Sequence, residues 1–596
     1  MAKDDQNCIK KLKIMRGEVN WEIKNERRKF LNQFYILIEN WEGQLPNLPD
    51  IFRSEEIDWL LEQHAKIMCK TKVILKKSLL LDFVIRCGYK DQPKVNENGN
   101  PLLRRTTPLH IVARHEYCLL LHYITRDLFK IYDRFDVNYN DEKSCYTHFH
   151  VACRYGCDEV VKKFLELGQD PNCLSEESDA SSVNSPMHLA LVNNHKQVVR
   201  LLLRFGADPN LTDAEGSTPL HLICDHCDDD FMEMFFKINE DMHRTLQVDA
   251  LDNRGWAPLH LALDRRQKKK TELLLSRCAN PNLVNADGKS PLHMICTRDQ
   301  KFDNYDSDGS DDSENSKDSD DSTDSNDESE SHDVDDYKLM EIFFKTCDEK
   351  HQTVDVDARD DFGRTPLHLA VRDKNEKLAE LLLRRGANPN RTKSGGLTAL
   401  HIMCKEGQGD DDIYNDYVDE EFVELFFKIN HEMQLSVKVD AVDEKGNTPL
   451  YYALHSGAGK VVELLLRNGA DPNLADAEGL TPLHIISKGD KNYYCDGDRD
   501  LLKIFFEINY DKHQQLQVDA FDKEGNTPLH LALNRNIADR TIVALLLSNG
   551  ANPNLADASG STPLHMMCNH YYNGYEFAKM FFDISDENDQ TVHIDA

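Results

Sequence analysis

The sequence lacks any long apolar segment. Its 596 residues contain no run of about 18 apolar residues, the length at which a segment becomes a candidate membrane-spanning helix. The N-terminus, MAKDDQNCIKK, also lacks the apolar stretch of a secretory signal. We therefore expect a protein that neither spans a membrane nor is secreted. A hydrophobic content of 40% with 29% charged residues fits a folded chain with a large core.

The motifs of common enzyme sites are missing as well. No Gly-rich phosphate loop, HExxH or GxSxG occurs, and the acidic side chains have no partner in a predicted cleft. Cys224 and Cys227 form one CxxC, but no second ligand pair follows at the spacing of a structural zinc site. We therefore predict no catalytic residue, no metal and no cofactor, and interpret the chain as a non-enzyme.

The sixteen cysteines lack the tight, regular spacing of a disulfide framework. This scatter favours a reducing compartment, the cytoplasm or the nucleus. The formal net charge is −33, which repels phosphate backbones and argues against nucleic acid as the main ligand.

What the sequence does contain is one short motif, repeated. TPLH or a close variant places histidines at 110, 150, 188, 221, 260, 293, 368, 401, 484, 530 and 565, and TPLY places Tyr451 in a twelfth copy. Thr is a good helix N-cap and Pro fits the first helical position, so Thr218-Pro219 begins a helix. A second apolar stripe precedes Gly206, which supplies the left-handed conformation that ends a helix. Each unit is predicted to form two helices and a hairpin, which bury their apolar faces by stacking.

TPLHLA followed by LLLxxGAxPN resembles the ankyrin repeat, and the resemblance covers about residues 106–596. It implies an all-α repeat solenoid of about twelve stacked ankyrin repeats. It also implies that the motif histidines are structural and hydrogen-bond between neighbouring hairpins. Tyr451, THFH at 147–150 and TALH at 398–401 depart from the motif at single joints.

From about residue 185 onward, two types of repeat alternate. One reads LLLxxGA(D/N)PN, and the other carries a VDA hairpin and extra chain between its two helices. The extra segments lie around 225–230, 297–336, 405–418, 487–500 and 569–575, and we expect them at one edge of the array. They are interpreted either as neutral drift at a tolerant site or as a second binding edge.

The chain is predicted to have four parts. Residues 1–105 carry twenty Lys/Arg against fifteen Asp/Glu and show helical apolar spacing, so we expect three to five helices that form an end cap or a separate partner-binding module. Residues 106–300 and 337–596 are the repeats. Residues 301–336 are an acidic insertion, because 303–336 hold sixteen acids and one lysine and are expected to be disordered.

The leading functional hypothesis is a non-enzymatic scaffold or adaptor that binds other proteins through the concave surface of hairpins and first helices. The alternative is an adaptor that selects substrates for a ubiquitin ligase or kinase docked on the N-terminal helices. Hairpin positions supply the candidate partner-binding residues: Glu215, Asn253, Arg254, Trp256, Asp287, Lys289, Arg364, Glu444, Lys445, Lys523 and Glu524. Trp256 is the expected anchor, because Trp and Arg dominate interface energies.

Two further expectations concern modification and the end of the chain. Serines fall every third residue in the insertion, at Ser307, Ser310, Ser313, Ser316, Ser319, Ser322 and Ser325. This spacing indicates a tandem expansion or a phosphorylation cascade that runs back from Ser325. The sequence stops after a VDA-like hairpin, so Met566, Met567, Phe581 and Phe582 are expected to face water, and a truncated chain is the favoured explanation.

Overall fold

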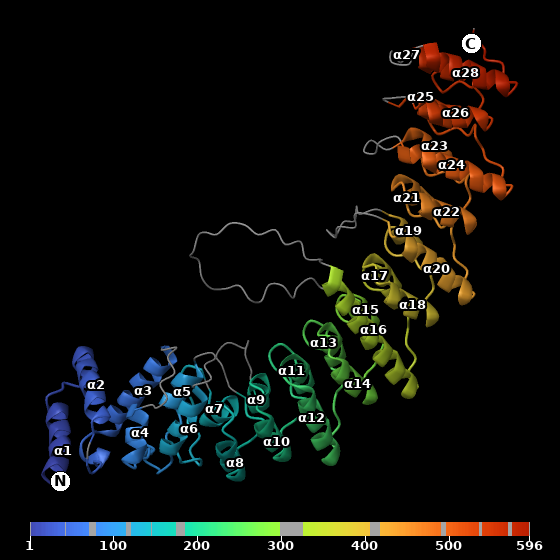
Figure 1. The fold of residues 1–596 in the computed structure, drawn as a ribbon. Helices are drawn as coiled ribbons and strands as arrows, with labels where there is room; N and C mark the ends of the chain where they lie inside the picture. The colour runs from blue at the N-terminus through green and yellow to red at the C-terminus, as the bar shows by residue number, and fades with distance from the viewer. Residues whose placement is uncertain are drawn as a thin grey trace. The chain divides into compact units, whose positions relative to one another are not determined.

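A computed structural model describes residues 2–41, 43–70, 79–114, 121–144, 146–174, 185–297, 326–405, 418–489, 496–535, 539–569 and 575–594. It divides into an N-terminal unit, Met1–Ala279, and a C-terminal unit, Asn280–Ala596, each with its own contacts. Over the described residues the elements are helices and a few isolated bridges (Figure 1). The predicted all-α repeat solenoid is confirmed.

The N-terminal unit begins with four helices and continues with five helix pairs among its described residues. The leader helices are α1 (Ala2–Gly17), α2 (Lys24–Glu39), α3 (Ser54–Lys70) and α4 (Leu79–Arg86), with a short 3-10 turn at Leu48–Asp50. The pairs are α5 (Pro108–Ala113) with α6 (Leu121–Ile131), α7 (His148–Arg154) with α8 (Asp158–Glu166), α9 (Pro186–Val192) with α10 (Lys196–Arg204), α11 (Pro219–His226) with α12 (Asp229–Asp241), and α13 (Pro258–Asp264) with α14 (Lys268–Ser276).

The leader stacks on the first repeat as another pair of helices would. Helix α3 packs against α5, and α4 packs against α6. A buried ion network ties this contact: the Arg105 guanidinium lies 2.5 Å from Asp58 and 3.0 Å from Asp91, and the Tyr139 hydroxyl donates to Asp91 at 2.7 Å. These contacts place the leader against the first repeat, and both interpretations of residues 1–105, an end cap and a separate partner-binding module, stay predictions.

The C-terminal unit holds seven further helix pairs among its described residues. They are α15 (Pro291–Cys296) with α16 (Asn326–Glu349), α17 (Pro366–Arg372) with α18 (Glu376–Arg384), α19 (Ala399–Cys404) with α20 (Glu420–Glu432), α21 (Pro449–His455) with α22 (Gly459–Arg467), α23 (Pro482–Lys488) with α24 (Asp496–Asp511), α25 (Pro528–Leu533) with α26 (Arg540–Ser548), and α27 (Pro563–Asn569) with α28 (Tyr575–Glu587). First helices contact first helices and second helices contact second helices along the stack. Of the extra segments expected in this unit, residues 298–325, 406–417, 490–495 and 570–574 lie outside the described residues, whereas residues 326–336, 487–488 and 496–500 belong to helices.

Helix α16 corrects one expectation. The acidic stretch was expected to be disordered to residue 336, but residues 326–336 belong to this helix. The helix is anchored by Leu339, Met340 and Phe343, which are fully buried. Residues 303–325, with all seven serines from 307 to 325, lie outside the described residues, so their phosphorylation stays a prediction.

The last repeat corrects a second expectation, which concerned the exposure of its core side chains. Phe581 was expected to face water, yet both Phe577 and Phe581 are fully buried, because α28 packs its apolar face against α26. Phe582, Met566 and Met567 are half-buried. The core side chains of this repeat are therefore shared with the preceding repeat.

Side-chain hydrogen bonds link the two alternating types of repeat. In the C-terminal unit, the Asn of each PN turn bonds across to the VDA-type repeat that follows. Asn473 donates to the Gln515 carbonyl at 2.9 Å and accepts from the Gln517 amide at 2.8 Å. In return, Asp519 of the VDA turn accepts from the Asn552 amide of the next repeat at 2.8 Å. The same roles recur in Asn282, Asp357, Asn390, Asp440 and Asn554. Each type of repeat therefore supplies an Asn or Asp side chain that bonds to the backbone of the repeat that follows.

Candidate functional site

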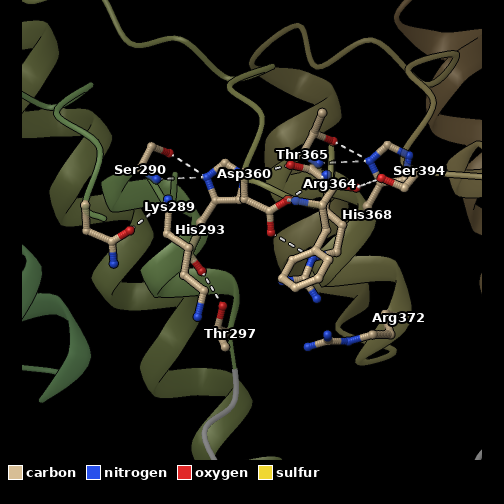
Figure 2. Close-up of polar contacts among 12 residues, drawn as sticks. Lys289, Ser290, His293, Thr297, Asp360, Arg364, Thr365, His368, Arg372 and Ser394 are labelled. Atoms are coloured by element: carbon tan, nitrogen blue, oxygen red, sulfur yellow. Dashed lines mark hydrogen bonds and ion pairs between the residues drawn. The ribbon is translucent and has the colours of Figure 1, made fainter. Parts of the chain in front are cut away.

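Most of the described hairpins are fixed by an acidic or amide side chain at the start of the turn, although Lys393 holds this position in the hairpin at 393–397. Asp360 is buried, and its carboxylate accepts from the backbone N–H groups of Phe362 at 3.0 Å and Arg364 at 2.8 Å. The Arg364 guanidinium returns to the same carboxylate at 2.7 Å (Figure 2). Equivalent carboxylates or amides fix other turns: Asp252, Asn285, Asp443, Asp476, Asp522 and Asp557.

The motif histidines join successive hairpins. The Thr365 N–H donates to His368 Nδ1 at 3.0 Å, so this neutral ring carries its proton on Nε2, which donates to the Arg391 carbonyl at 3.0 Å. His293 likewise donates to the Arg364 carbonyl at 2.9 Å (Figure 2). The predicted structural role of these histidines is confirmed.

Burial keeps these imidazoles neutral. It lowers the pKa of His110, His150, His188 and His368 to about 4, since little water remains to solvate a charged ring. Geometry acts in the same direction, because a proton on Nδ1 would face the N–H group that donates to it. These histidines therefore serve as fixed hydrogen-bonding parts rather than as acids or bases at neutral pH.

Backbone bonds bring the hairpin tips together in a row. The Asn253 N–H donates to the Glu215 carbonyl at 2.9 Å in the N-terminal unit. In the C-terminal unit, the Ser394 N–H donates to the Phe362 carbonyl at 3.0 Å, and the tips at Glu444 and Lys523 make the same bond. The side chains on these tips are therefore presented at fixed spacing.

Family comparisons agree with this geometry. Models described as "Ankyrin repeats (3 copies)" match residues 149–245, 187–285, 335–415 and 491–591, and one described as "Ankyrin repeats (many copies)" matches 432–486. The chain belongs to the ankyrin-repeat family. Ankyrin repeats are generally protein–protein interaction modules and generally not enzymes.

Several curated ankyrin-repeat proteins are similar. Human "Transient receptor potential cation channel subfamily A member 1" is 25% identical over 57% of this chain and 28% of its own length. The chicken "Nuclear factor NF-kappa-B p105 subunit" is 26% identical over 34% of this chain and 18% of its own length. "Ankyrin repeat protein nuc-2" of Neurospora crassa is 31% identical over 34% of this chain and 20% of its own length. The chain spans less than a third of the length of these relatives.

In the N-terminal unit the predicted contact residues form one cluster. Glu215, Asn253 and Arg254 are exposed on two adjoining tips of this ankyrin array. The Arg254 guanidinium lies 5.6 Å from the centre of the Trp256 ring, which is half-buried. The Trp256 carbonyl also accepts from His221 at 2.9 Å, so the backbone is fixed while part of the indole stays accessible.

In the C-terminal unit the predicted residues are spread along several tips. Asp287, Glu444, Lys445, Lys523 and Glu524 are exposed, and Lys289 is half-buried. Arg364 differs, because only 15% of its side chain is exposed and its guanidinium is paired with Asp360. Its geometry indicates a role in holding the hairpin.

Sequence reasoning missed the apolar side chains on the same row. Phe362 is 62% exposed, Val442 53% and Phe521 52%, although each is a large hydrophobic residue. Val442 and Phe521 precede the turn Asp, and Phe362 follows it by two residues. That position next to the turn could have been detected by aligning the hairpins with one another, since hairpin tips are exposed.

The remaining candidate sites do not provide reactive groups. Burial raises the pKa of the Cys224 and Cys227 thiols to about 12, which keeps both protonated. Across the part of the chain that the structure describes, no group of three His, Cys, Asp or Glu side chains could hold a metal ion. None of the described helices is long and apolar enough to cross a membrane.

Proposed function

We propose that this protein is a scaffold or adaptor that binds other proteins along the row of hairpin tips in each of its two units. Each row combines exposed charged groups with exposed apolar ones, and backbone hydrogen bonds join several neighbouring tips. Because the tips are already ordered, a partner loses little affinity to the ordering of this surface. This ordered row carries the proposal.

The composition of the row suits a protein surface. Arg254 with Trp256, and Phe362 and Phe521, provide aromatic and Arg side chains of the kind that dominate binding energies. Carboxylates such as Glu215, Glu444 and Glu524 surround them, and the whole chain carries a net charge of −33. A partner with a positively charged surface is favoured over a nucleic acid. We place this activity in the cytoplasm or nucleus.

A second candidate function rests on the leader. Ile14 on α1 is 53% exposed, Ile36 on α2 65%, and Ile23, which caps the N-terminus of α2, 45%. Exposed apolar side chains of this size can bind a second protein. In that arrangement the leader would hold a ligase or kinase while the array selects its substrate.

The test is proximity labelling with the full chain, two pairs of charge-reversal variants and the variant Ile36→Asp. Glu215→Lys and Glu444→Lys change exposed tip residues, whereas Lys237→Glu and Lys428→Glu change exposed positions on the second helices α12 and α20. We expect the tip variants to lose the enriched proteins and the helix variants to keep them. If only the second-helix variants lost the enriched proteins, the proposal would be contradicted. If only Ile36→Asp lost them, the second candidate function would be favoured.

A further inference from the structure

Helix α21 departs from the repeat motif at two adjacent positions. Thr448 and Pro449 begin the helix as in other repeats, but Tyr451 stands where eleven repeats have histidine. Tyr452 follows where those repeats have Ile, Val, Leu or Met. Two neighbouring aromatic residues therefore replace an imidazole and an aliphatic side chain.

The first replacement removes a structural group. On either side, His401 donates to the Asn447 carbonyl at 3.2 Å and His484 to the Asn526 carbonyl at 3.1 Å, while their Nδ1 atoms accept from their own N-cap amides. A phenol has one polar atom at the end of its ring, so Tyr451 cannot make both bonds of an imidazole. Departures from a consistent local pattern are expected at functional sites.

The three rings at α21 form a contiguous aromatic surface. The Tyr451 and Tyr452 ring centres lie 5.5 Å apart at 86°, and the Tyr451 ring stacks on His455 at 4.2 Å and 29°. Tyr451 and Tyr452 are half-buried and His455 is exposed. We call Tyr451, Tyr452 and His455 the α21 aromatic cluster.

The hairpin fixes this cluster in place and makes it attractive to cations. The Tyr452 hydroxyl donates to Asp443 at 2.6 Å, which orients the ring and increases its electron density. The Lys405 ammonium lies 5.8 Å from the centre of the same ring, so this cluster already attracts an amine of the chain. Exposed Glu444 adds negative charge on the hairpin beside Asp443.

We infer that the α21 aromatic cluster determines specificity in the C-terminal unit by binding a lysine or arginine side chain of a partner protein. Cation–π attraction to the rings and the nearby carboxylates select that side chain. The inference rests on the proposed protein-binding function and names the chemistry that one part of the row recognises. It also accounts for the absence of histidine at position 451, since tyrosine there provides an aromatic surface in place of the histidine bond to the next hairpin.

The test is selection of a phage-displayed library of random 12-residue peptides on the full chain. The key variant is Tyr451→His/Tyr452→Leu, which restores the motif of the other repeats and leaves the formal charge unchanged. We expect this variant to stay folded, with an unfolding temperature within about 2 °C of the wild type, because it regains the histidine bonds and loses the bond from Tyr452 to Asp443. We also expect it to bind the selected Lys- or Arg-containing peptides at least tenfold more weakly, whereas Lys428→Glu binds them as the wild type does.

Three results would overturn the inference. Peptides that are sensitive to Glu444→Lys but bind equally to the double variant would leave the proposed function intact and contradict the role of the cluster. Cluster-dependent peptides without Lys or Arg would contradict the cation-binding chemistry of the inference. A selection that yields no peptide sensitive to any tip or cluster substitution would contradict both proposals.

Discussion

At the scale of single residues, the motif histidines show how one side chain can carry a fold. In His368, for example, the ring accepts from its own N-cap amide and donates to the next hairpin, so both bonds need the neutral ring with its proton on Nε2. Such a residue stabilises the array only while it stays unprotonated. Histidine is a reactive residue in many enzymes, but here it forms structural hydrogen bonds between repeats.

Mild acid should therefore destabilise the protein. The pKa of His110, His150, His188 and His368 is lowered to about 4, against about 6.5 in an unfolded chain. The unfolded state binds more protons between these values, so stability is complete above pH 6.5 and falls as the pH decreases toward 4. We expect roughly 1–2 kcal/mol less stability per histidine at pH 5 than at pH 7.

Thermal denaturation followed by circular dichroism at constant ionic strength measures this effect. The variant His368→Gln should lose part of the pH dependence between 7 and 5. His431→Gln, at an exposed position on α20, should retain it. An unfolding temperature that is equal at pH 7 and pH 5 would show that the histidines are not the acid-sensitive groups.

Trp256 is the residue whose removal should most weaken binding to the N-terminal unit. Its ring lies against Arg254 at an exposed tip, and truncation to alanine removes both the aromatic surface and the support of the guanidinium. We expect Trp256→Ala to cost about 2 kcal/mol of binding free energy, roughly a 30-fold loss of affinity. Titration calorimetry against the first partner identified measures it, with Trp256→Phe as the milder control. Unchanged affinity for Trp256→Ala would end its role as an anchor.

At the scale of elements, the contacts between hairpins depend on small residues and on paired amides. Gly288 has φ +69°, and a Cβ there would lie 2.6 Å from the Asp361 side chain and 2.9 Å from its backbone N. Gly386 has φ +92° but nothing within 4 Å of such a Cβ. Gly386 is needed only for its left-handed backbone conformation. Gly288 is needed for that conformation and also because the next hairpin lies too close for a Cβ.

These two glycines provide a matched comparison. Gly386→Ala should cost about 1 kcal/mol, the penalty of a left-handed backbone for a residue with a Cβ. Gly288→Ala should cost more, about 2–4 kcal/mol, because the adjoining hairpin must also move. Urea denaturation of the two variants under the same conditions measures the difference. Equal costs would mean that the close approach of the two hairpins adds nothing.

The amide bridges between repeats can be tested within one repeat. Asn473→Ala removes a donor and an acceptor shared with the next repeat, and we expect a loss of about 1–2 kcal/mol. Asn468→Ala removes only a bond to Leu464 in its own helix and should cost less. Hydrogen exchange of the Gln517 amide should accelerate in the first variant alone. Equal exchange in both would contradict the bridge.

At the scale of the whole molecule, most of the architecture could be predicted from the sequence because the repeat is local and is read many times. Thr-Pro begins a helix wherever it occurs, and in several repeats the motif histidine donates to the carbonyl just before the N-cap residue of the next repeat. The helical state of residues 326–336 could not be predicted from composition, since it depends on the burial of Leu339 and Phe343 further along. The burial of Phe581 likewise depends on its contact with α26.

The binding surface was only partly predictable for a related reason. Turn positions indicated which tips are exposed, but not that Arg364 folds back onto Asp360. Phe362 and Tyr452 were missed because composition treats aromatic residues as core. Their accessibility depends on which side of the hairpin or helix they occupy.

The most direct measurement of the central claim is site-specific photo-crosslinking in cells that express the full chain. A photoreactive amino acid is placed at Glu215, Glu444 or Lys523 on the hairpin row, and at Lys237 or Lys428 on the second helices. The account predicts discrete crosslinked proteins from the hairpin positions and none from the helix positions. Crosslinks that form only from the helices, or no crosslinks from any hairpin position, would contradict it.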